Sequence, residues 1–284
     1  MAEYRFLGSS DNDAVFEAFQ LAFSDYQVDM RMSREQFAYR LLRDGIRLSR
    51  SVGAFEGKEL VGFCLSGVGT WNGEHTIYDA GTGVVPDYRR RGIGEGMFDF
   101  MLPRLKQHGF SQYLLEVISS NDGALRLYRK LGFRDTRKLK VLRLKSQLPN
   151  REGTESQCVR EVETPDWRLY QSFWEFDPSW QNSIDAAKRI AEDTVILEVL
   201  AGGQCVGYGI VSRSSGSLFQ LAVDKSYRRK RFGSMLLSEL QLRVLAGEPL
   251  KVNNIDAGAN ATLSFYESNG FGVALEQHEL VRRS

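Results

Sequence analysis

The chain has 284 residues, a length that corresponds to two domains of ordinary size. With 42% hydrophobic and 26% charged residues, its composition excludes a disordered or fibrous protein. The 37 basic and 36 acidic residues leave a net charge of +1, which argues against a general nucleic-acid-binding protein. Cys64, Cys158 and Cys205 are far apart, and no apolar run approaches about 18 residues. These features favour a reduced, cytoplasmic protein without a disulfide framework, a zinc site or a membrane span.

An internal repeat organises the sequence. Residues 84–97 read VVPDYRRRGIGEGM and residues 223–235 read VDKSYRRKRFGSM, and each segment lies between a strand-like run and a helix-like run. Downstream, LRLYRKLGF ends at Phe133 and LSFYESNGF ends at Phe271. A polar segment with Pro and Gly separates the two halves. We therefore predict two copies of one fold, in residues 1–145 and 157–284, joined by a linker over residues 146–156.

Hydrophobic periodicity predicts the elements of the first copy in chain order. It indicates helices over 11–24 and 33–45, strands between 51 and 84, a helix over 94–107, a buried strand over 113–118, a helix over 122–131 and a strand over 139–144. Ser33 and Gln36 have capping-box spacing. Pro103 lies inside the third helix, which we expect to kink or end early. This order of elements is typical of a layered α/β fold.

A glycine-bearing turn is the most informative segment of the first copy. Residues 82–95 pass from a strand through a turn into a helix. The first N–H groups of a helix have no partner within it, and with the helix dipole they form an anion site suited to a diphosphate. Gly92 and Gly94 allow close approach of the main chain, and Arg90 and Arg91 add positive charge. A solvent-exposed basic turn next to a helix cap is the alternative interpretation.

Three side chains downstream of this turn form a second candidate group. Glu116 interrupts an apolar strand, and a carboxylate there needs an explanation because burying an unpaired charge is costly. Asn121 follows at the junction between strand and helix, and Tyr128 lies on the helix. Each residue also has a structural interpretation, as a solvent-facing glutamate, a helix N-cap and a core aromatic residue.

Together, YRRRGIG and LEVISSNDGALRLYRKLGF resemble the GNAT superfamily of acetyl-CoA-dependent N-acetyltransferases. The RRRGIG of residues 89–94 matches that family's motif, (Gln/Arg)-x-x-Gly-x-(Gly/Ala). The resemblance implies an α/β (α+β layered) protein with two tandem GNAT-like domains, each a central mixed, twisted sheet flanked by helices. It also implies an acyltransferase that moves an acetyl group from acetyl-CoA to a primary amine by direct attack in a ternary complex. No metal is implied.

The same resemblance assigns roles to residues of the first copy. Glu116 corresponds to a general base, and Tyr128 to the acid that protonates the departing CoA thiolate. Asp79 and His75 are the alternative bases. Asn121 corresponds to a residue that binds the pantetheine or the region near the thioester. The pantetheine arm and the diphosphate would contact a run of strand and turn residues, namely Thr82, Gly83, Val84, Arg89, Arg90, Arg91, Gly92, Ile93, Gly94 and Glu95.

The second copy departs from this pattern. Arg231 replaces Gly92, and Asn254 stands 12 residues before Tyr266, where the first copy has Glu116. A side chain at Arg231 should crowd the diphosphate turn. We therefore expect the second copy to bind acetyl-CoA weakly or not at all. Aromatic residues between 167 and 180 have helical spacing and indicate a core, with a substrate cleft as the alternative.

Two other functions stay open at this point. One is a non-catalytic acetyl-CoA-binding or sensor module, and the other is a mycothiol-synthase-like tandem acyltransferase whose second copy is active. The acceptor is expected to be a small-molecule or peptide amine, and Tyr26 and Met30 lie in the segment that often contacts it in the family. We expect a monomer or a homodimer, with neither nucleic acid nor membrane as a partner.

Overall fold

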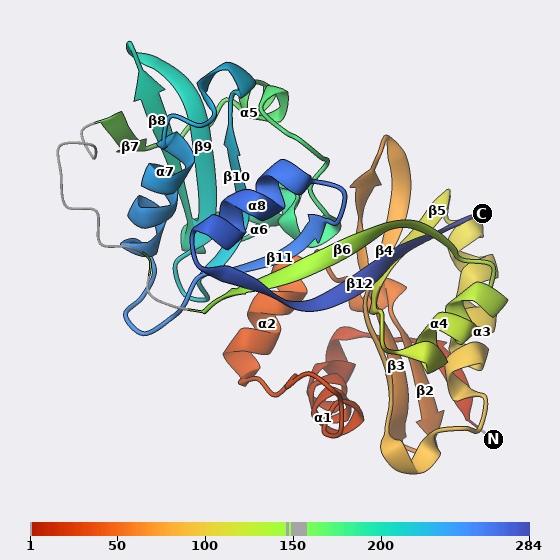
Figure 1. Cartoon of the computed structure of the whole chain (residues 1–284). Coiled ribbons are helices and arrows are strands. Elements are labelled where there is room, and N and C mark those ends of the chain that lie inside the picture. The colour runs from red at the N-terminus through yellow and green to blue at the C-terminus, as the bar shows by residue number, and fades with distance from the viewer. Residues whose placement is uncertain (1, 146–147, 149–157) are drawn as a thin grey trace. The chain divides into compact units, whose positions relative to one another are not determined.

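The computed structural model of the chain describes residues 2–145, 148 and 158–284 (Figure 1). The predicted linker therefore lies almost entirely outside the described residues. The chain divides into two compact units, the first made of Met1–Thr136 and His278–Ser284 and the second of Arg137–Gln277. The last strand of each half contributes residues to both units, and the domain bounds of 1–145 and 157–284 stay a prediction.

In the first unit, strands β1 to β5 are neighbours in chain order, and β12 follows β5. The pairs β1–β2, β2–β3 and β3–β4 are antiparallel and the pair β4–β5 is parallel, so the sheet is mixed as predicted. Its strands are β1 (Glu3–Phe6), β2 (Val52–Glu56), β3 (Glu59–Trp71), β4 (Glu74–Val84) and β5 (Gln112–Ile118). The two strands that continue from one unit into the other are β6 (Arg134–Leu144) and β12 (Phe271–Arg283).

Helices cover both faces of this sheet. Phe63 of β3 packs against Phe19 of α1, whereas its neighbour Cys64 belongs to the cluster that contains Met97 and Phe98 of α3. Successive residues of a strand point to opposite faces, so α1 and α3 lie on opposite sides. The helices are α1 (Asn12–Ala22), α2 (Arg34–Arg43), α3 (Ile93–Gln107) and α4 (Asp122–Lys130), and Figure 1 shows α3 beside α4.

Local sequence signals explain where two of these helices begin and end. The Ser33 hydroxyl accepts a hydrogen bond from the Gln36 N–H, and the Gln36 side chain accepts one from the Ser33 N–H, which confirms the capping box. Of the two expectations at Pro103, a kink or an early end, the early end is wrong, because α3 continues to Gln107. Its buried residues extend past the proline to Leu105, so packing against the core offsets the missing N–H.

The second unit repeats the same arrangement. Strands β8–β9 and β9–β10 are antiparallel and β10–β11 is parallel, as in the series from β2 to β5. Its strands are β7 (Val159–Glu161), β8 (Thr194–Ala201), β9 (Gln204–Ser212), β10 (Ser217–Val223) and β11 (Lys251–Asp256). Its helices are α5 (Trp167–Ser172), α6 (Ile184–Arg189), α7 (Phe232–Gln241) and α8 (Asn260–Ser268). The predicted internal repeat is therefore a repeat of structure.

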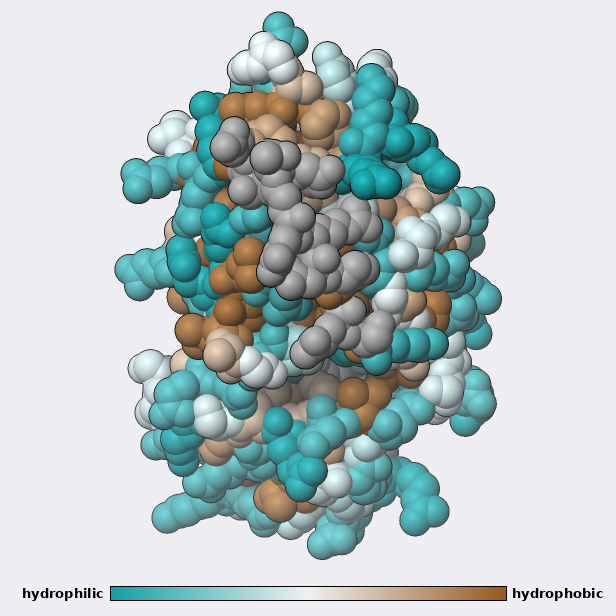
Figure 2. Space-filling view, turned by 60° about the vertical axis from the view of Figure 1, so that its left-hand side comes forward, coloured by the Kyte–Doolittle hydropathy of each residue, from teal (hydrophilic) through white to brown (hydrophobic). Residues whose placement is uncertain are grey.

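The surface of the protein mixes polar and apolar side chains. Figure 2 shows small hydrophobic groups among hydrophilic ones on one face. Within the described ranges, no helix has the length and hydrophobicity that crossing a membrane requires. In the same ranges, no cluster of three or more His, Cys, Asp or Glu side chains is placed to hold a metal ion.

Candidate active site

The first unit has an opening where β4 and β5 separate. The two strands are paired only as far as Asp79 and Leu115. Ala80 is skipped in the antiparallel pairing of β4 with β3, and such a bulge bends the strand that contains it. Arg40 of α2 donates to the Ala80 carbonyl, which fixes the bulge. In the described part of the chain, residues 80–84 of β4 have no strand partner on the β5 side, so their main-chain groups on that edge can pair with a ligand.

A buried carboxylate and a tyrosine meet on one face of this opening. The Tyr128 hydroxyl donates to Oδ2 of Asp79 over 3.3 Å, and the Thr82 hydroxyl donates to the same oxygen over 2.8 Å. The Gly81 N–H donates to Oδ1 of Asp79 over 2.9 Å. Burial raises the pKa of Asp79 to about 6 despite these donors. Burial, with the charge of Asp79, raises the pKa of Tyr128 well above its usual value, so its phenol is protonated near neutral pH.

A second carboxylate lies on the other face. Tyr78 precedes Asp79 in β4, so the two side chains point to opposite faces of the sheet. The Tyr78 hydroxyl donates a short hydrogen bond to the carboxylate of Glu116. Glu116 is the first residue of β5 beyond the last pair with β4, and it is partly exposed. Glu116 and Tyr128 thus approach the opening from opposite faces of the sheet.

The turn between β4 and α3 has the main-chain geometry of an anion site. Gly92 is the N-cap of α3 with φ = 76°, and Arg90 has φ = 60°. Within the described residues, the N–H groups of residues 92–95 donate to no acceptor. A Cβ at Gly92 would meet nothing within 4 Å, so this glycine suits the position by its left-handed conformation and not because space is short. Adjacent N–H groups at the start of a helix favour a bound phosphate.

Two arginine side chains stabilise this turn. Arg89 forms two hydrogen bonds of 2.7 Å with the carboxylate of Asp25, which follows α1. It also donates to the carbonyls of Ala22 and Val84. Arg91 donates to a carbonyl within the turn over 2.7 Å. The side chain of Arg89 thereby ties the turn to the end of α1, a partnership that the sequence analysis missed.

Asn121 has the structural role considered above and a further contact. It is the N-cap of α4, and its Oδ1 accepts from the N–H three residues later over 3.1 Å. Its Nδ2 donates to the Tyr26 hydroxyl over 3.4 Å, and Ser120 donates to Gln27 over 2.6 Å. The segment between α1 and α2 therefore contacts the mouth of the opening. Tyr26 also lines an open hollow of about 880 Å³ formed by α1, α2 and the segment between them, and Met30 is not among the residues that line it.

The structure does not bring His75 to this opening. His75 precedes Asp79 by four residues in β4, which is about 13 Å along a strand. Its ring stacks on Phe110, and its Nδ1 lies 3.3 Å from the Gly109 carbonyl oxygen. Tyr78 was not predicted as a site residue, although a tyrosine beside an aspartate in an apolar strand was a usable signal.

Comparisons with known proteins agree with this geometry. The model described as "Acetyltransferase (GNAT) family" matches residues 12–133, and the one described as "Acetyltransferase (GNAT) domain" matches residues 190–273. A thialysine N-epsilon-acetyltransferase from Sus scrofa is 30% identical over 131 residues, which cover 37% of this chain and 76% of that protein. The chain belongs to the GNAT acetyltransferase family.

Other GNAT proteins match smaller parts of the sequence or the fold. The [ribosomal protein bS18]-alanine N-acetyltransferase of Escherichia coli is 38% identical over 52 residues, 18% of this chain and 35% of that protein. The chain thus spans about a third of the length of that relative. A tandem GNAT protein from the clavulanic acid biosynthesis pathway has a TM-score of 0.73 at 14% identity, with 100% of this chain and 98% of that one covered. At this identity the likeness shows the fold alone.

The second GNAT domain keeps the turn and loses the polar groups around the opening. Arg231, the N-cap of α7, has φ = 68°, and Arg229 has φ = 64°. The main chain therefore has the same shape as at Gly92, although the residue is an arginine. Leu218 occupies the position of Asp79. Val252 pairs with Leu218 as Leu115 pairs with Asp79, so Asn253, next to Asn254, occupies the position of Glu116. Weak acetyl-CoA binding by this domain stays a prediction.

Proposed function

We propose that the first unit is an N-acetyltransferase that moves the acetyl group of acetyl-CoA to a primary amine by direct attack in a ternary complex. The observation that carries the proposal is the opening between β4 and β5. It has a carboxylate on one face, a protonated phenol on the other and a turn of unpaired amides beside it.

Acetyl-CoA would bind along the free edge of β4. Thr82, Gly83 and Val84 would pair with the amide groups of the pantetheine arm, as an added strand would. The main chain of residues 89–95 would hold the diphosphate, and the positive charges of its arginines would favour it. The Asn121 amide, whose Oδ1 already caps α4, would contact the arm through Nδ2.

The reaction needs three proton transfers, two from the nitrogen and one to the sulfur. An alkylammonium with a pKa near 10 is a poor nucleophile at neutral pH until it loses a proton, and Glu116 would accept that proton. The free amine then attacks the thioester carbonyl, a carbon–nitrogen bond forms and the carbon–sulfur bond breaks. The departing thiolate takes the hydroxyl proton of Tyr128. The added nitrogen loses its second proton as the amide forms, and that proton restores the phenol of Tyr128. The products are an amide and CoA, and no covalent intermediate with the protein is required.

Asp79 would act in this scheme as a positioning residue for Tyr128. Its carboxylate accepts from the phenol and is itself fixed by the Gly81 and Thr82 donors. With a pKa of about 6, it is ionised at neutral pH and is also the alternative base. Comparing Glu116→Gln with Asp79→Asn separates the two assignments. Loss of the base should remove the acidic limb of the pH profile of kcat/KM.

The test measures release of free CoA from acetyl-CoA with a panel of amines. The panel should include thialysine and, separately, a peptide with an N-terminal alanine, because the names of the similar proteins mention thialysine and alanine. Glu116→Gln should lower turnover at least about 100-fold. Glu59→Gln is the matched control, because Glu59 also accepts from a tyrosine hydroxyl, that of Tyr88, outside the opening. Acetyl-CoA binding without CoA release to any amine would contradict the proposal and support a sensor.

A further inference from the structure

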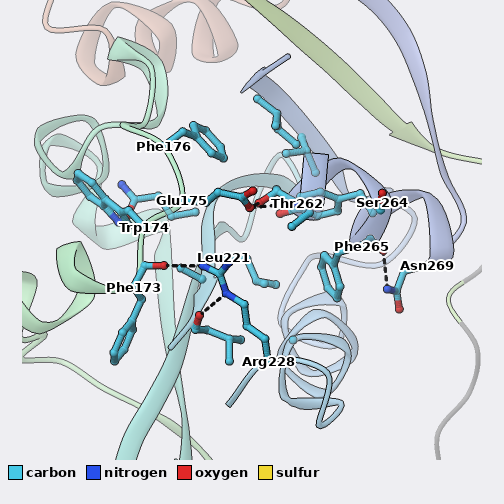
Figure 3. Close-up of a pocket in the computed structure, with 18 of the residues that line it drawn as sticks. Phe173, Trp174, Glu175, Phe176, Leu221, Arg228, Thr262, Ser264, Phe265 and Asn269 are labelled. Carbon is cyan, nitrogen blue, oxygen red and sulfur yellow. Dashed lines mark hydrogen bonds between the residues drawn. The ribbon is translucent and has the colours of Figure 1, made fainter. Parts of the chain in front are cut away.

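The second unit contains a cavity of about 840 Å³ where β10 and β11 separate. Many of its lining side chains are aromatic, among them Phe173, Trp174, Phe176, Phe219, Phe232 and Phe265. In Figure 3, residues 173–176 lie on one side of the cavity, and Thr262, Ser264 and Phe265 of α8 lie on the other. The volume is that of a site for a small organic molecule.

One end of this cavity contains Arg228, the counterpart of Arg89. The first unit provides a carboxylate that pairs with this arginine, and the described part of the second unit does not. Arg228 donates to the carbonyls of Phe173 and Val223, as Arg89 does to those of Ala22 and Val84 (Figure 3). Three residues after Ala22 stands Asp25, which pairs with Arg89, but three residues after Phe173 stands Phe176. No carboxylate therefore pairs with Arg228 in the described parts of the chain.

The charges around Arg228 also favour an anion. Arg229 and Arg231 line the cavity too, and Glu175 contributes the single carboxylate among the described residues that line it. Glu175 accepts from the N–H and the hydroxyl of Thr262 at the start of α8. Its charge is thus stabilised by the helix terminus, and the arginine end stays positive.

Two polar groups of residues that line the cavity have no hydrogen-bond partner among the residues that the structure describes. Asn254 is 1% exposed and lines the cavity, and its Nδ2 has no hydrogen-bond partner among residues 2–145, 148 and 158–284. The hydroxyl of Tyr266 also forms no hydrogen bond in these ranges, because Leu218 occupies the position of Asp79. A buried donor without an acceptor costs about 1–3 kcal/mol, so a ligand with a carbonyl or hydroxyl oxygen would be stabilised here.

The groups that would carry acetyl transfer are replaced by apolar or neutral ones. Leu218 and Leu221 stand where the first unit has Asp79 and Thr82, and Asn253 stands where it has Glu116. No carboxylate therefore stands at these positions to accept a proton from an amine. Of these replacements, Leu221 and Asn253 line the cavity, and neither carries a charge.

We infer that this cavity binds an amphipathic anion, a molecule that joins a phosphate or carboxylate group to an apolar body, and that it does so without group transfer. The anionic group lies against Arg228, Arg231 and the amides of the turn, and the apolar body lies among the aromatic side chains. The inference concerns the second unit alone and does not depend on catalysis in the first.

The test is calorimetric titration of the full chain with octyl phosphate and, separately, with octanoate, which distinguishes the two anionic groups. Inorganic phosphate tests the anionic group alone, and octanol tests the apolar body alone. Each should bind at least about tenfold more weakly than octyl phosphate. Leu221→Trp fills the cavity and should weaken binding at least tenfold. Arg231→Glu reverses one charge and should weaken it about tenfold, which is ~1.4 kcal/mol.

Matched controls use the same substitutions outside the cavity. Leu242 is 73% exposed and Lys225 is exposed, and neither lines the cavity. Leu242→Trp and Lys225→Glu should bind octyl phosphate within about twofold of the wild type. Because Arg231 is exposed, its variant should fold even if Leu221→Trp does not. The inference is overturned if neither anion binds saturably, if both cavity variants bind as the wild type does, or if binding at the second unit requires the nucleotide of acetyl-CoA.

Discussion

Replacing Tyr128 by phenylalanine removes one hydroxyl from the proposed active site and leaves the ring in place. The ring packs edge-on against Phe98 and Phe133, with centroid distances of 5.7 and 5.6 Å, so the core should be retained. The hydrogen bond that is lost is 3.3 Å long, and Asp79 keeps two other donors. We therefore expect Tyr128→Phe to lower the free energy of unfolding by only about 1 kcal/mol.

The effect on catalysis should be larger than the effect on stability. A general acid typically contributes a factor of about 100 or more, which corresponds to about 2.7 kcal/mol of transition-state stabilisation. The assay is CoA release at saturating acetyl-CoA, combined with urea unfolding of the same samples. Tyr113→Phe, which removes another buried hydroxyl from the same unit, is the control and should keep its turnover. A Tyr128→Phe protein with kcat within about threefold of wild type would refute the acid assignment.

Three further predictions follow from the same contacts. Because burial holds the pKa of Asp79 at about 6, the native state binds its proton more tightly than the unfolded state does. The stability of Asp79→Asn relative to wild type should therefore rise by about 2.4 kcal/mol between pH 4 and pH 7. A constant difference in urea midpoints would contradict this. Asn121→Ala removes the N-cap of α4 and should lower the free energy of unfolding by about 1 kcal/mol, whereas Asn121→Ser should lower it much less. The KM for acetyl-CoA should rise in both variants. An unchanged KM would exclude the Asn121 amide from binding acetyl-CoA. A Cβ at Gly67 would lie 2.4 Å from the Asp44 carbonyl oxygen, so Gly67→Ala should lower the free energy of unfolding by at least about 2 kcal/mol. A urea midpoint equal to that of the wild type would contradict this, because it would mean that the backbone shifts enough to remove the clash.

Features that depend on neighbouring residues could be predicted from the sequence. The left-handed Gly92 begins α3, and Gly132, with φ = 88°, follows α4, because each conformation is a local requirement of the chain. The capping box at Ser33 and Gln36 is equally local. The internal sequence repeat predicted two α/β domains, because two similar runs of strands and helices imply two similar sheets.

Features that depend on distant partners could not be predicted in this way. Arg89 pairs with Asp25, which lies 64 residues away, and hydrophobic patterning does not specify which carboxylate an arginine meets. The bond between Tyr78 and Glu116 spans 38 residues and explains why a strand tolerates a carboxylate. The division of β6 and β12 between the two units depends on distant pairing in the same way.

The most direct test of the account is a crystal structure of the full chain with CoA. Electron density for the diphosphate should lie within about 3 Å of the N–H groups of residues 92–95, with the pantetheine along residues 82–84 and the sulfur next to the Tyr128 hydroxyl. A structure in which CoA occupies the cavity of the second unit while the turn at Gly92 binds nothing would contradict it.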